Sequence, residues 1–479
     1  VGVADSGIDY LHEDLVANLW QNTDEICNNG IDDDNDGYVD NCYGINTVNG
    51  TGDPDDDVGH GTRVSGILGA VGNNQIGVSG VNWQSSIMAL KFMDADGKGT
   101  VSDLIQAIEF AMDNNVRVMN MSFGSYSFSQ FEKQAMQNAG NILFVAAAGN
   151  ESGNNDISPL YPAGYDLPNI ISVAASTESD SLAHFSNYGS LSVDLAGPGT
   201  SIMSTTLMDS YGVSTGTSMS TAFVSGVAAL VLAADNSLSA IQIKDRILRT
   251  VDSVPALQDQ VITGGRVNAA LAVSTTDTGP HIFKLVPNKA GVGAEVTISG
   301  ASFLGTPGSV FFGNNTEAPI DSWSNDKIVC QVPEGAVSGS VQVRTHDQAW
   351  SNEVQFELST EPDTYRVSFA HASCRAEDHY FLILSNVSDQ SSQIHTRGVG
   401  SEGDVIIKII TLQPYANKVI RVADFGIQDE EMMINLESES FFGAYLLKFS
   451  QDGKEIFPMY PTPWGPETLY DDRMTELYQ

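Results

Sequence analysis

Positive charge is scarce in this sequence. Its 479 residues include 22 Lys and Arg against 60 Asp and Glu, which gives a formal net charge of −38. Nucleic-acid binding depends on a basic surface, so we expect no nucleic-acid partner. Anionic membrane surfaces are disfavoured for the same reason. The excess of carboxylates instead suits cation binding or a well-solvated secreted protein.

Long apolar runs and cysteines are also scarce. We find no apolar run of the length that spans a bilayer and expect no membrane span. Four cysteines are too few for a disulfide scaffold. Cys27 and Cys42 flank one acidic loop, which suits a local disulfide, whereas Cys330 and Cys374 could be free or paired with each other. The chain begins without Met or a signal-like segment, in what resembles a strand already under way, so we expect a cut N-terminus.

Strands and helices alternate over the first half of the chain. Apolar segments predict strands at 1–4, 87–92, 116–122, 142–148, 170–175 and 193–196. Helical periodicity predicts helices at 60–70, 101–112, 130–138, from about 218 onwards, 238–250 and 266–273. This alternation predicts an α/β domain over residues 1–275, with a parallel sheet covered by helices on both faces.

The second half of the chain has no helical periodicity. Residues 279–358 contain short alternating runs separated by Gly, Pro and Asn, which predicts an all-β sandwich. Residues 364–460 alternate in the same way and predict a second β-rich module, whereas the tail 461–479 has no assignment. Trp323 and Trp350 could bind carbohydrate, or they could pack in a core.

Ser218 stands where a stretch of small residues turns into an apolar helix. Met219, Phe223, Val227 and Leu230 follow it at helical spacing. A serine at this place could simply cap the helix. The unpaired N–H groups of a helix N-terminus also favour negative charge, which would suit a nucleophile and an oxyanion.

Three other polar residues occupy comparable junctions. Asp5 ends the first predicted strand, His60 opens a helix, and Asn150 follows an apolar strand. Such positions gather at one edge of an open α/β sheet. Acyl transfer by a serine needs a base and an acid that orients the base, and an amide can stabilise the oxyanion. Singly, Asp5 could be a turn residue, His60 structural and Asn150 a loop former, but their joint order and contexts favour one site.

The segments around these residues resemble the motifs of the subtilisin-like serine proteases, or subtilases. The resemblance covers residues 1 to about 273 and is carried by Asp5-Ser-Gly-Ile-Asp, Gly59-His-Gly-Thr, Asn120-Met-Ser-Phe-Gly, Ala146-Ala-Ala-Gly-Asn and Gly216-Thr-Ser-Met. It implies a secreted serine endopeptidase that works through an acyl-enzyme. Ser218 would be the nucleophile, His60 the general base and acid, Asp5 the residue that orients His60, and Asn150 an oxyanion donor.

The same resemblance implies a substrate-binding surface. An extended peptide would pair with the backbone of Ser122, Phe123 and Gly124, and the specificity pocket would be lined by Ala147, Ala148 and Gly149. Because the lining residues are small, we expect a broad apolar or aromatic preference. We further expect a monomeric, extracellular and bacterial protein. The alternative is a non-catalytic, subtilase-like surface or adhesion protein.

Two residues depart from the family pattern. Arg63 stands where the family usually has histidine, and a permanent cation there would oppose protonation of His60 and extend activity to lower pH. Ala222 stands where the family usually has proline, and alanine is well tolerated within a helix.

An acidic loop has the spacing of a calcium site. Its carboxylates fall at positions 1, 3, 5 and 9 of an oxygen-ligand loop, with a glycine at position 6 and a carbonyl at position 7. The predicted ligands are Asp32, Asp34, Asp36, the carbonyl of Tyr38, and Asp40. Position 12 is Tyr43, so the loop is not an EF-hand; it resembles the loops of extracellular calcium proteins. The alternative is a solvated acidic loop. The aspartates at 53 and 55–57 could bind a second ion or only solvate their loop, and we favour the second interpretation.

Residues 279–358 resemble the IPT/TIG type of immunoglobulin-like domain. The supporting segments are Val296-Thr-Ile-Ser-Gly-Ala-Ser-Phe and Val310-Phe-Phe-Gly. The resemblance implies a role in attachment to a polymer or cell surface, or in spacing.

Overall fold

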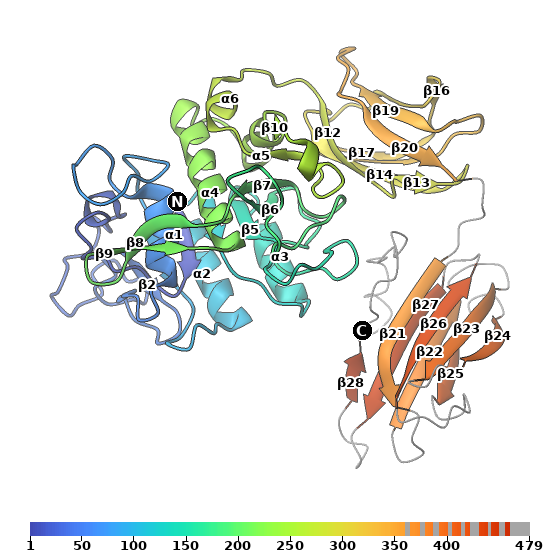
Figure 1. Cartoon of the computed structure of the whole chain (residues 1–479), viewed down its shortest axis with the longest axis horizontal. Coiled ribbons are helices and arrows are strands. Elements are labelled where there is room, and N and C mark those ends of the chain that lie inside the picture. The colour runs from blue at the N-terminus through green and yellow to red at the C-terminus, as the bar shows by residue number, and fades with distance from the viewer. Residues whose placement is uncertain are drawn as a thin grey trace.

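The computed structural model describes residues 1–359 in full and, beyond them, the backbone of strands β21 to β28 between residues 365 and 459 (Figure 1). The predicted tail 461–479 and the side chain of Cys374 lie outside the described residues.

A nine-stranded sheet forms the centre of the first domain. Its order is β10-β11-β7-β6-β5-β4-β1-β3-β2, and all neighbours are parallel except the pair β10–β11. The strands are β1 (Gly2–Asp5), β2 (Gly44–Asn46), β3 (Met88–Lys91), β4 (Val118–Met121), β5 (Leu143–Ala147), β6 (Ile170–Ser176), β7 (Leu195–Pro198), β10 (Asp252–Ser253) and β11 (Gly265–Arg266). The predicted parallel sheet is confirmed.

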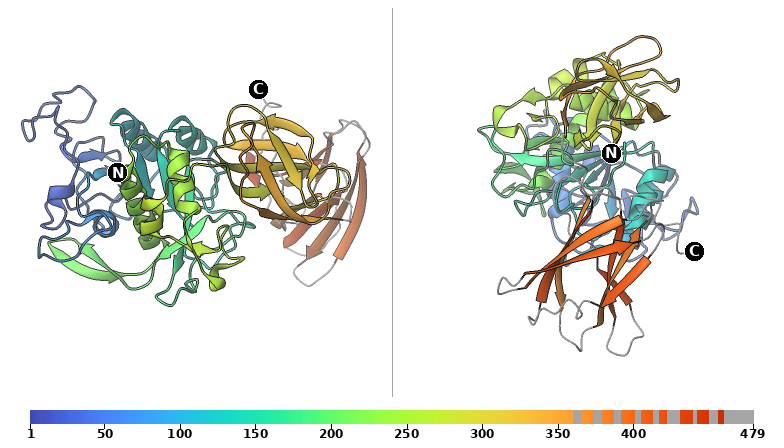
Figure 2. Two further views of the ribbon diagram at one scale, coloured as in Figure 1. Left: turned by 90° about the horizontal axis from the view of Figure 1, so that it is seen from above. Right: turned by 90° about the vertical axis from the view of Figure 1, so that its right-hand side faces the viewer.

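Helices cover both faces of this sheet, because successive residues of a strand point to opposite sides. Met119 and Phe144 face α2 (Val101–Asp113) and α3 (Gln130–Asn138), whereas Val118 and Val145 face α4 (Thr217–Ala234) and α5 (Ala240–Leu248). Figure 2 shows helices on both sides of the sheet. The helices are α1 (His60–Gly69), α2 (Val101–Asp113), α3 (Gln130–Asn138), α4 (Thr217–Ala234), α5 (Ala240–Leu248) and α6 (Ala269–Ser274), and two 3₁₀ turns span Val16–Asn18 and Pro255–Leu257.

Polar caps fix where several helices begin. Thr100 and Ser129 accept the N–H of the third residue of α2 and α3, respectively. Ser239 forms a capping box with Gln242 at the start of α5. Asn268 caps α6, so this helix begins three residues later than predicted; Arg266 belongs to β11.

Helix α4 corrects one sequence expectation. By length and composition alone this 18-residue helix is apolar enough to cross a membrane, so the statement that no apolar run reaches that length is wrong. Its most apolar window is 61% buried inside the protein, and Val224, Val227 and Val231 pack against the sheet. It is therefore a core helix of this domain.

A β-hairpin that the sequence did not predict lies before α4. Strands β8 (Ile202–Thr206) and β9 (Ser210–Ser214) pair in antiparallel fashion. The tip binds the segment that follows β1: the Met208 N–H donates to Asp9 and the Glu13 N–H donates to Asp209.

The second domain is a sandwich of two sheets. One has the order β12-β14-β18-β17 and the other β13-β20-β19-β15-β16. Its strands are β12 (His281–Val286), β13 (Lys289–Ala290), β14 (Glu295–Ala301), β15 (Ser309–Phe312), β16 (Thr316–Glu317), β17 (Ile320–Trp323), β18 (Lys327–Gln331), β19 (Gly339–Arg344) and β20 (Val354–Leu358). Cys330 is a free, buried thiol, and Trp323 packs against Phe303.

The last described part consists of two four-stranded sheets, β21-β26-β23-β24 and β25-β22-β27-β28. The strands are β21 (Tyr365–Ser373), β22 (His379–Asn386), β23 (Ser392–Gly400), β24 (Val405–Leu412), β25 (Asn417–Arg421), β26 (Glu431–Ser438), β27 (Phe442–Phe449) and β28 (Ile456–Met459). The predicted β-rich character is confirmed.

Candidate active site

Asp5 and His60 form a hydrogen-bonded pair at the carboxyl edge of the sheet. The Asp5 side chain is fully buried at the end of β1, and its Oδ1 lies 2.8 Å from Nδ1 of His60. Oδ1 also accepts the N–H of Ser6 at 2.7 Å. The His60 side chain, at the first position of α1, is 34% exposed. The hydrogen bond to Asp5 therefore fixes Nδ1 of His60, and the ring edge that carries Nε2 is left towards the surface.

Asp56 holds the start of α1 against the end of β1. This buried carboxylate accepts the N–H groups of Gly59 and Thr62 at 2.7 and 2.9 Å, so it caps the helix. It also accepts the hydroxyl of Ser6 at 2.8 Å, and that hydroxyl accepts the N–H of Gly61. The interpretation of Asp56 as part of a solvated acidic run is therefore wrong, because its oxygens satisfy buried backbone donors.

Electrostatics at His60 have a clear direction. The charge of Asp5 raises the pKa of His60 above its ordinary value, and Asp56 acts in the same direction. Burial of the ring and the charge of Arg63 act against this rise. The Arg63 guanidinium donates to the Ser214 hydroxyl at 2.8 Å. The predicted direction of the Arg63 effect therefore agrees with the electrostatics, but Asp5 outweighs it.

Ser218 is the second residue of α4. The N-cap is Gly216, so the alternative in which Ser218 caps the helix is wrong. The Ser218 hydroxyl donates to the carbonyl of Ser122 at 3.0 Å, and the Ser122 hydroxyl donates back to the Ser218 carbonyl at 2.9 Å. Ser218 Oγ and His60 are thus at the same edge of the fold without a hydrogen bond between them in this structure. Catalytic hydrogen bonds are often unformed without substrate.

Asn150 is anchored by its carbonyl oxygen. Oδ1 accepts the N–H and the hydroxyl of Thr217, the first residue of α4, at 2.9 and 3.0 Å. This contact supplies the cap that Gly216 lacks. The side-chain NH₂ is thereby turned away from Thr217 and remains available as a donor. The structure thus brings Asn150 to the same helix N-terminus as Ser218.

The predicted substrate segments flank this point. Ser122 is buried and its hydroxyl is hydrogen-bonded to the Ser218 carbonyl. Phe123 packs against Phe92, with 4.6 Å between the ring centroids, and Gly124 is exposed. Ala147, Ala148 and Gly149 are buried at the end of β5. A side chain at Gly149 would come within 2.4 Å of Asn187 Nδ2 at a φ of +114°, so glycine is required there.

Next to that segment lies a carboxylate that sequence reasoning did not weigh. Glu151 Oε2 accepts the N–H of Asn150 at 2.8 Å and the hydroxyl of Tyr126 at 3.2 Å. Because Glu151 directly follows Asn150 in the sequence, its closeness to the candidate site could have been predicted.

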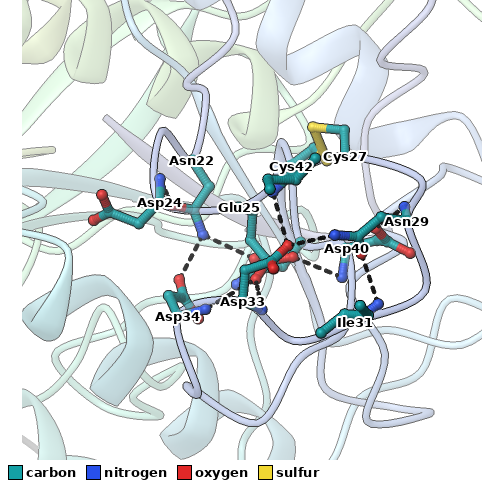
Figure 3. The surroundings of a disulfide bond; sticks show 12 residues. Asn22, Asp24, Glu25, Cys27, Asn29, Ile31, Asp33, Asp34, Asp40 and Cys42 are labelled. Carbon is teal, nitrogen blue, oxygen red and sulfur yellow. Dashed lines mark hydrogen bonds between the residues drawn. A yellow bond between two sulfur atoms is a disulfide. The ribbon is translucent and has the colours of Figure 1, made fainter.

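The acidic loop is closed by a disulfide between Cys27 and Cys42, as predicted (Figure 3). Carboxylate oxygens of Asp32 and Asp34 in this loop and of Glu25, two residues before Cys27, all lie within 4.8 Å of one another. Glu25 is buried and escaped sequence reasoning, because it lies outside the regular spacing of the loop.

The remaining predicted ligands have other contacts in this structure. The Asp40 carboxylate accepts the N–H groups of Asn29 and Gly30 at 2.9 and 3.0 Å. Asp36 accepts the N–H of Tyr38 and the amide of Asn41 at 2.9 and 2.6 Å. Burial, and then the charge of Asp34, raise the pKa of Asp36, so the loop carries like charges close together. Tyr38 packs its ring against Phe110.

The fold and the site together define a class: an α/β protein with an aspartate, a histidine and a serine at the carboxyl edge of a parallel sheet. The profile of the subtilase family matches residues 1–293, which is more than half of the chain, so this protein belongs to the subtilase family. The profile of the IPT/TIG domain matches residues 280–358.

The chain is also similar to individual proteins of known sequence or structure. Subtilisin-like protease 1 of Plasmodium vivax is 36% identical over 295 residues, which are 57% of this chain and 46% of that protein. Thermophilic serine proteinase of Bacillus sp. (strain AK1) is 35% identical over 276 residues, covering 57% of this chain and 61% of that protein. A crystal structure of a cold adapted subtilisin-like serine proteinase is 28% identical, with a TM-score of 0.45, covering 55% of this chain and 86% of that one. The chain thus spans about half the length of the Plasmodium relative.

Proposed function

We propose that this protein is a secreted serine endopeptidase that hydrolyses peptide bonds in proteins. The observation that carries the proposal is the buried Asp5–His60 pair, 2.8 Å between Oδ1 and Nδ1, at the same sheet edge as Ser218 on the first turn of α4. Hydrolases of this type need these three groups in these roles. Membership of the subtilase family supports the same reaction.

Ser218 acts as the nucleophile. When a peptide binds, the Ser218 hydroxyl breaks its hydrogen bond to the Ser122 carbonyl. It then transfers its proton to Nε2 of His60, and Ser218 Oγ attacks the scissile carbonyl carbon. The Asp5 carboxylate stabilises the imidazolium through Nδ1. His60 then gives the proton to the leaving amine. In the second half of the reaction, water gives a proton to His60 and its oxygen attacks the acyl carbon; the ester bond then breaks, Ser218 Oγ takes the proton back from His60, and the carboxylic acid product leaves.

Asn150 and the Ser218 N–H stabilise the oxyanion. The bond from Thr217 to Asn150 Oδ1 fixes the amide before the substrate arrives, so its donor needs no reorganisation when charge develops. The positive end of the α4 dipole also favours negative charge at this position.

The peptide substrate pairs with the backbone of Ser122, Phe123 and Gly124 as an added strand. Its residue before the scissile bond enters the pocket beside Ala147, Ala148 and Gly149, and the small lining selects apolar or aromatic residues. Peptides that differ only at that residue test this selectivity. A strict preference for basic residues would contradict this selectivity and would indicate that the Glu151 carboxylate binds the substrate side chain.

We further propose that the acidic loop binds Ca²⁺. Three carboxylate groups gather within 4.8 Å of one another, and clustered oxygen ligands are what Ca²⁺ requires. The predicted set of Asp32, Asp34, Asp36, Asp40 and the Tyr38 carbonyl is thereby extended by Glu25. The ion would screen carboxylates that otherwise repel.

Secretion is also a proposal. The Cys27–Cys42 disulfide supports an oxidising compartment, and the excess of acidic residues suits an extracellular protein. The bacterial source that we expected stays a prediction, since the relatives include both Bacillus and Plasmodium proteins. The monomeric state and attachment by the C-terminal domains are predictions of the same kind.

Casein hydrolysis by the full chain tests the proposed function. We expect turnover by the wild type and a loss of roughly 10⁶ in kcat in Ser218→Ala, with His60→Ala nearly as inactive, since these residues act as a unit; this magnitude comes from the related subtilisin and is applied here by analogy. Ser65→Ala on α1 is the matched serine control and should keep full activity. Binding to cells or polymers without turnover by the wild type would favour the adhesion protein instead.

A further inference from the structure

Strand β12 of the IPT/TIG domain lies against helix α5 of the subtilase domain (Figure 1). Phe283 of β12 and Ala301 of β14 belong to the same buried apolar cluster as Ile243 and Ile247 of α5. The Phe283 ring is 9% exposed and lies under the Lys244 ammonium at 5.5 Å from the ring centroid. The apolar core of the subtilase domain therefore continues into the second domain.

Charged groups from both domains meet around this apolar contact. His281 Nδ1 lies 2.7 Å from Asp245 Oδ1, and Lys284 Nζ lies 2.8 Å from Asp166 Oδ1. Asp245, whose side chain is 4% exposed, also binds Arg249, the residue directly after α5, at 2.5 Å. A buried carboxylate that loses a partner carries a desolvation penalty. Lys284 and His281 of β12 are thus each paired with a carboxylate of the subtilase domain.

The contact lies at the end of the sheet opposite the candidate site. Lys244 donates to the carbonyl of Ile170, the first residue of β6, and binds Asp194 directly before β7. Asp5, by contrast, is the last residue of β1. Because these strands are parallel, the second domain docks at their amino ends and the site lies at their carboxyl ends.

We infer that the IPT/TIG domain is a fixed structural support of the subtilase domain, docked through Phe283, His281 and Lys284 onto α5 and Asp166, and not a loosely tethered binding module. A tethered module would keep its polar linker extended and its apolar residues within its own core. Here Phe283 completes the core of the neighbouring domain. The inference does not depend on catalysis.

Hydrogen exchange on the full chain tests the docking. In an inactive Ser218→Ala background, which prevents self-digestion, we expect Phe283→Ala to increase exchange at least tenfold in the amides of α5. The amides of α2, on the other face of the sheet, should not change. Phe303→Ala is the matched control, because that ring packs within the second domain. Phe303→Ala should increase hydrogen exchange in the second domain more than in α5. Unchanged exchange at α5 in Phe283→Ala would overturn the inference.

Variants of the Lys284–Asp166 ion pair test the docking independently, in case Phe283→Ala does not fold. Lys284→Ala and Asp166→Ala should each lower the melting temperature of the subtilase domain by about 2–4 °C, and the double variant should lose no more than either single one. The ion pair Lys289–Glu357 lies within the second domain and is the control. Additive effects of Lys284 and Asp166, or separate melting transitions for the two domains, would contradict a fixed support.

Discussion

Asn150 offers the sharpest separation of structure from chemistry at the candidate site. Its Oδ1 caps α4 by accepting the N–H and the hydroxyl of Thr217, and its NH₂ is the proposed oxyanion donor. Asn150→Asp keeps an oxygen for the cap and loses the donor. Asn150→Ala loses both. Both variants should therefore lose catalysis, Asn150→Asp at least as severely because its carboxylate repels the oxyanion, whereas their stabilities should differ.

The expected magnitudes follow from the two roles. Loss of one oxyanion donor costs about 2.7–4 kcal/mol of transition-state stabilisation, or roughly 10²–10³ in kcat; this range comes from the related subtilisin and is applied here by analogy. Loss of the cap costs about 1 kcal/mol of folding stability. A carboxylate at the start of α4 interacts favourably with the helix dipole by about 0.3–1 kcal/mol. Asn150→Asp should therefore be nearly inactive and at least as stable as the wild type.

Steady-state kinetics on a peptide substrate and urea unfolding of the same preparations provide the assay. Asn150→Asp should lose kcat with little change in KM, because the lost interaction forms mainly in the transition state. Asn150→Ala should lose kcat by a similar factor and unfold at lower urea. If Asn150→Asp keeps kcat within tenfold of the wild type, Asn150 is a structural cap and the oxyanion assignment fails.

Three further predictions concern charge. Arg63→Met removes a cation that lowers the pKa of His60, so the acid limb of the pH profile of kcat/KM should move to higher pH. Lys98→Met, on an exposed loop, is the control and should leave the acid limb in place. If the profile of Arg63→Met does not move, Arg63 has no such effect. Asp56→Asn should move the same limb to lower pH and cost about 1–3 kcal/mol in urea unfolding, since a buried acceptor of several hydrogen bonds is weakened. Calcium at 100 times its Kd should add about 2.7 kcal/mol to folding, seen as a higher melting temperature that Asp34→Asn abolishes and Asp24→Asn keeps. No calcium effect in the wild type would reject that site.

The sequence predicted the regular parts of the first domain well, because their apolar residues repeat at the period of the element they form. Helix α3 matches its predicted bounds, α1 ends one residue earlier than predicted, and β1 begins and ends one residue later than predicted. The hairpin β8–β9 and strand β2 were missed. Both lie in segments rich in Gly, Asn, Ser and Thr, where the alternation is weak and the pairing depends on distant partners.

The site shows the same division between local and distant information. Asp5, His60, Asn150 and Ser218 each stand at a junction between an apolar run and a turn, which the sequence shows directly. The cap that Asn150 gives to Thr217 and the contact of Ser122 with Ser218 join residues that are 67 and 96 positions apart. Such contacts follow from the order of strands in the sheet and have no local pattern.

Labelling with a fluorophosphonate probe tests the central claim most directly. The probe reacts with a serine only where a base and an oxyanion site activate it. We predict one covalent adduct on the wild-type chain, located by peptide mapping on the segment that contains Ser218, and its absence in Ser218→Ala. An unlabelled wild type, or equal labelling of both proteins, would contradict the assignment of Ser218 as an activated nucleophile.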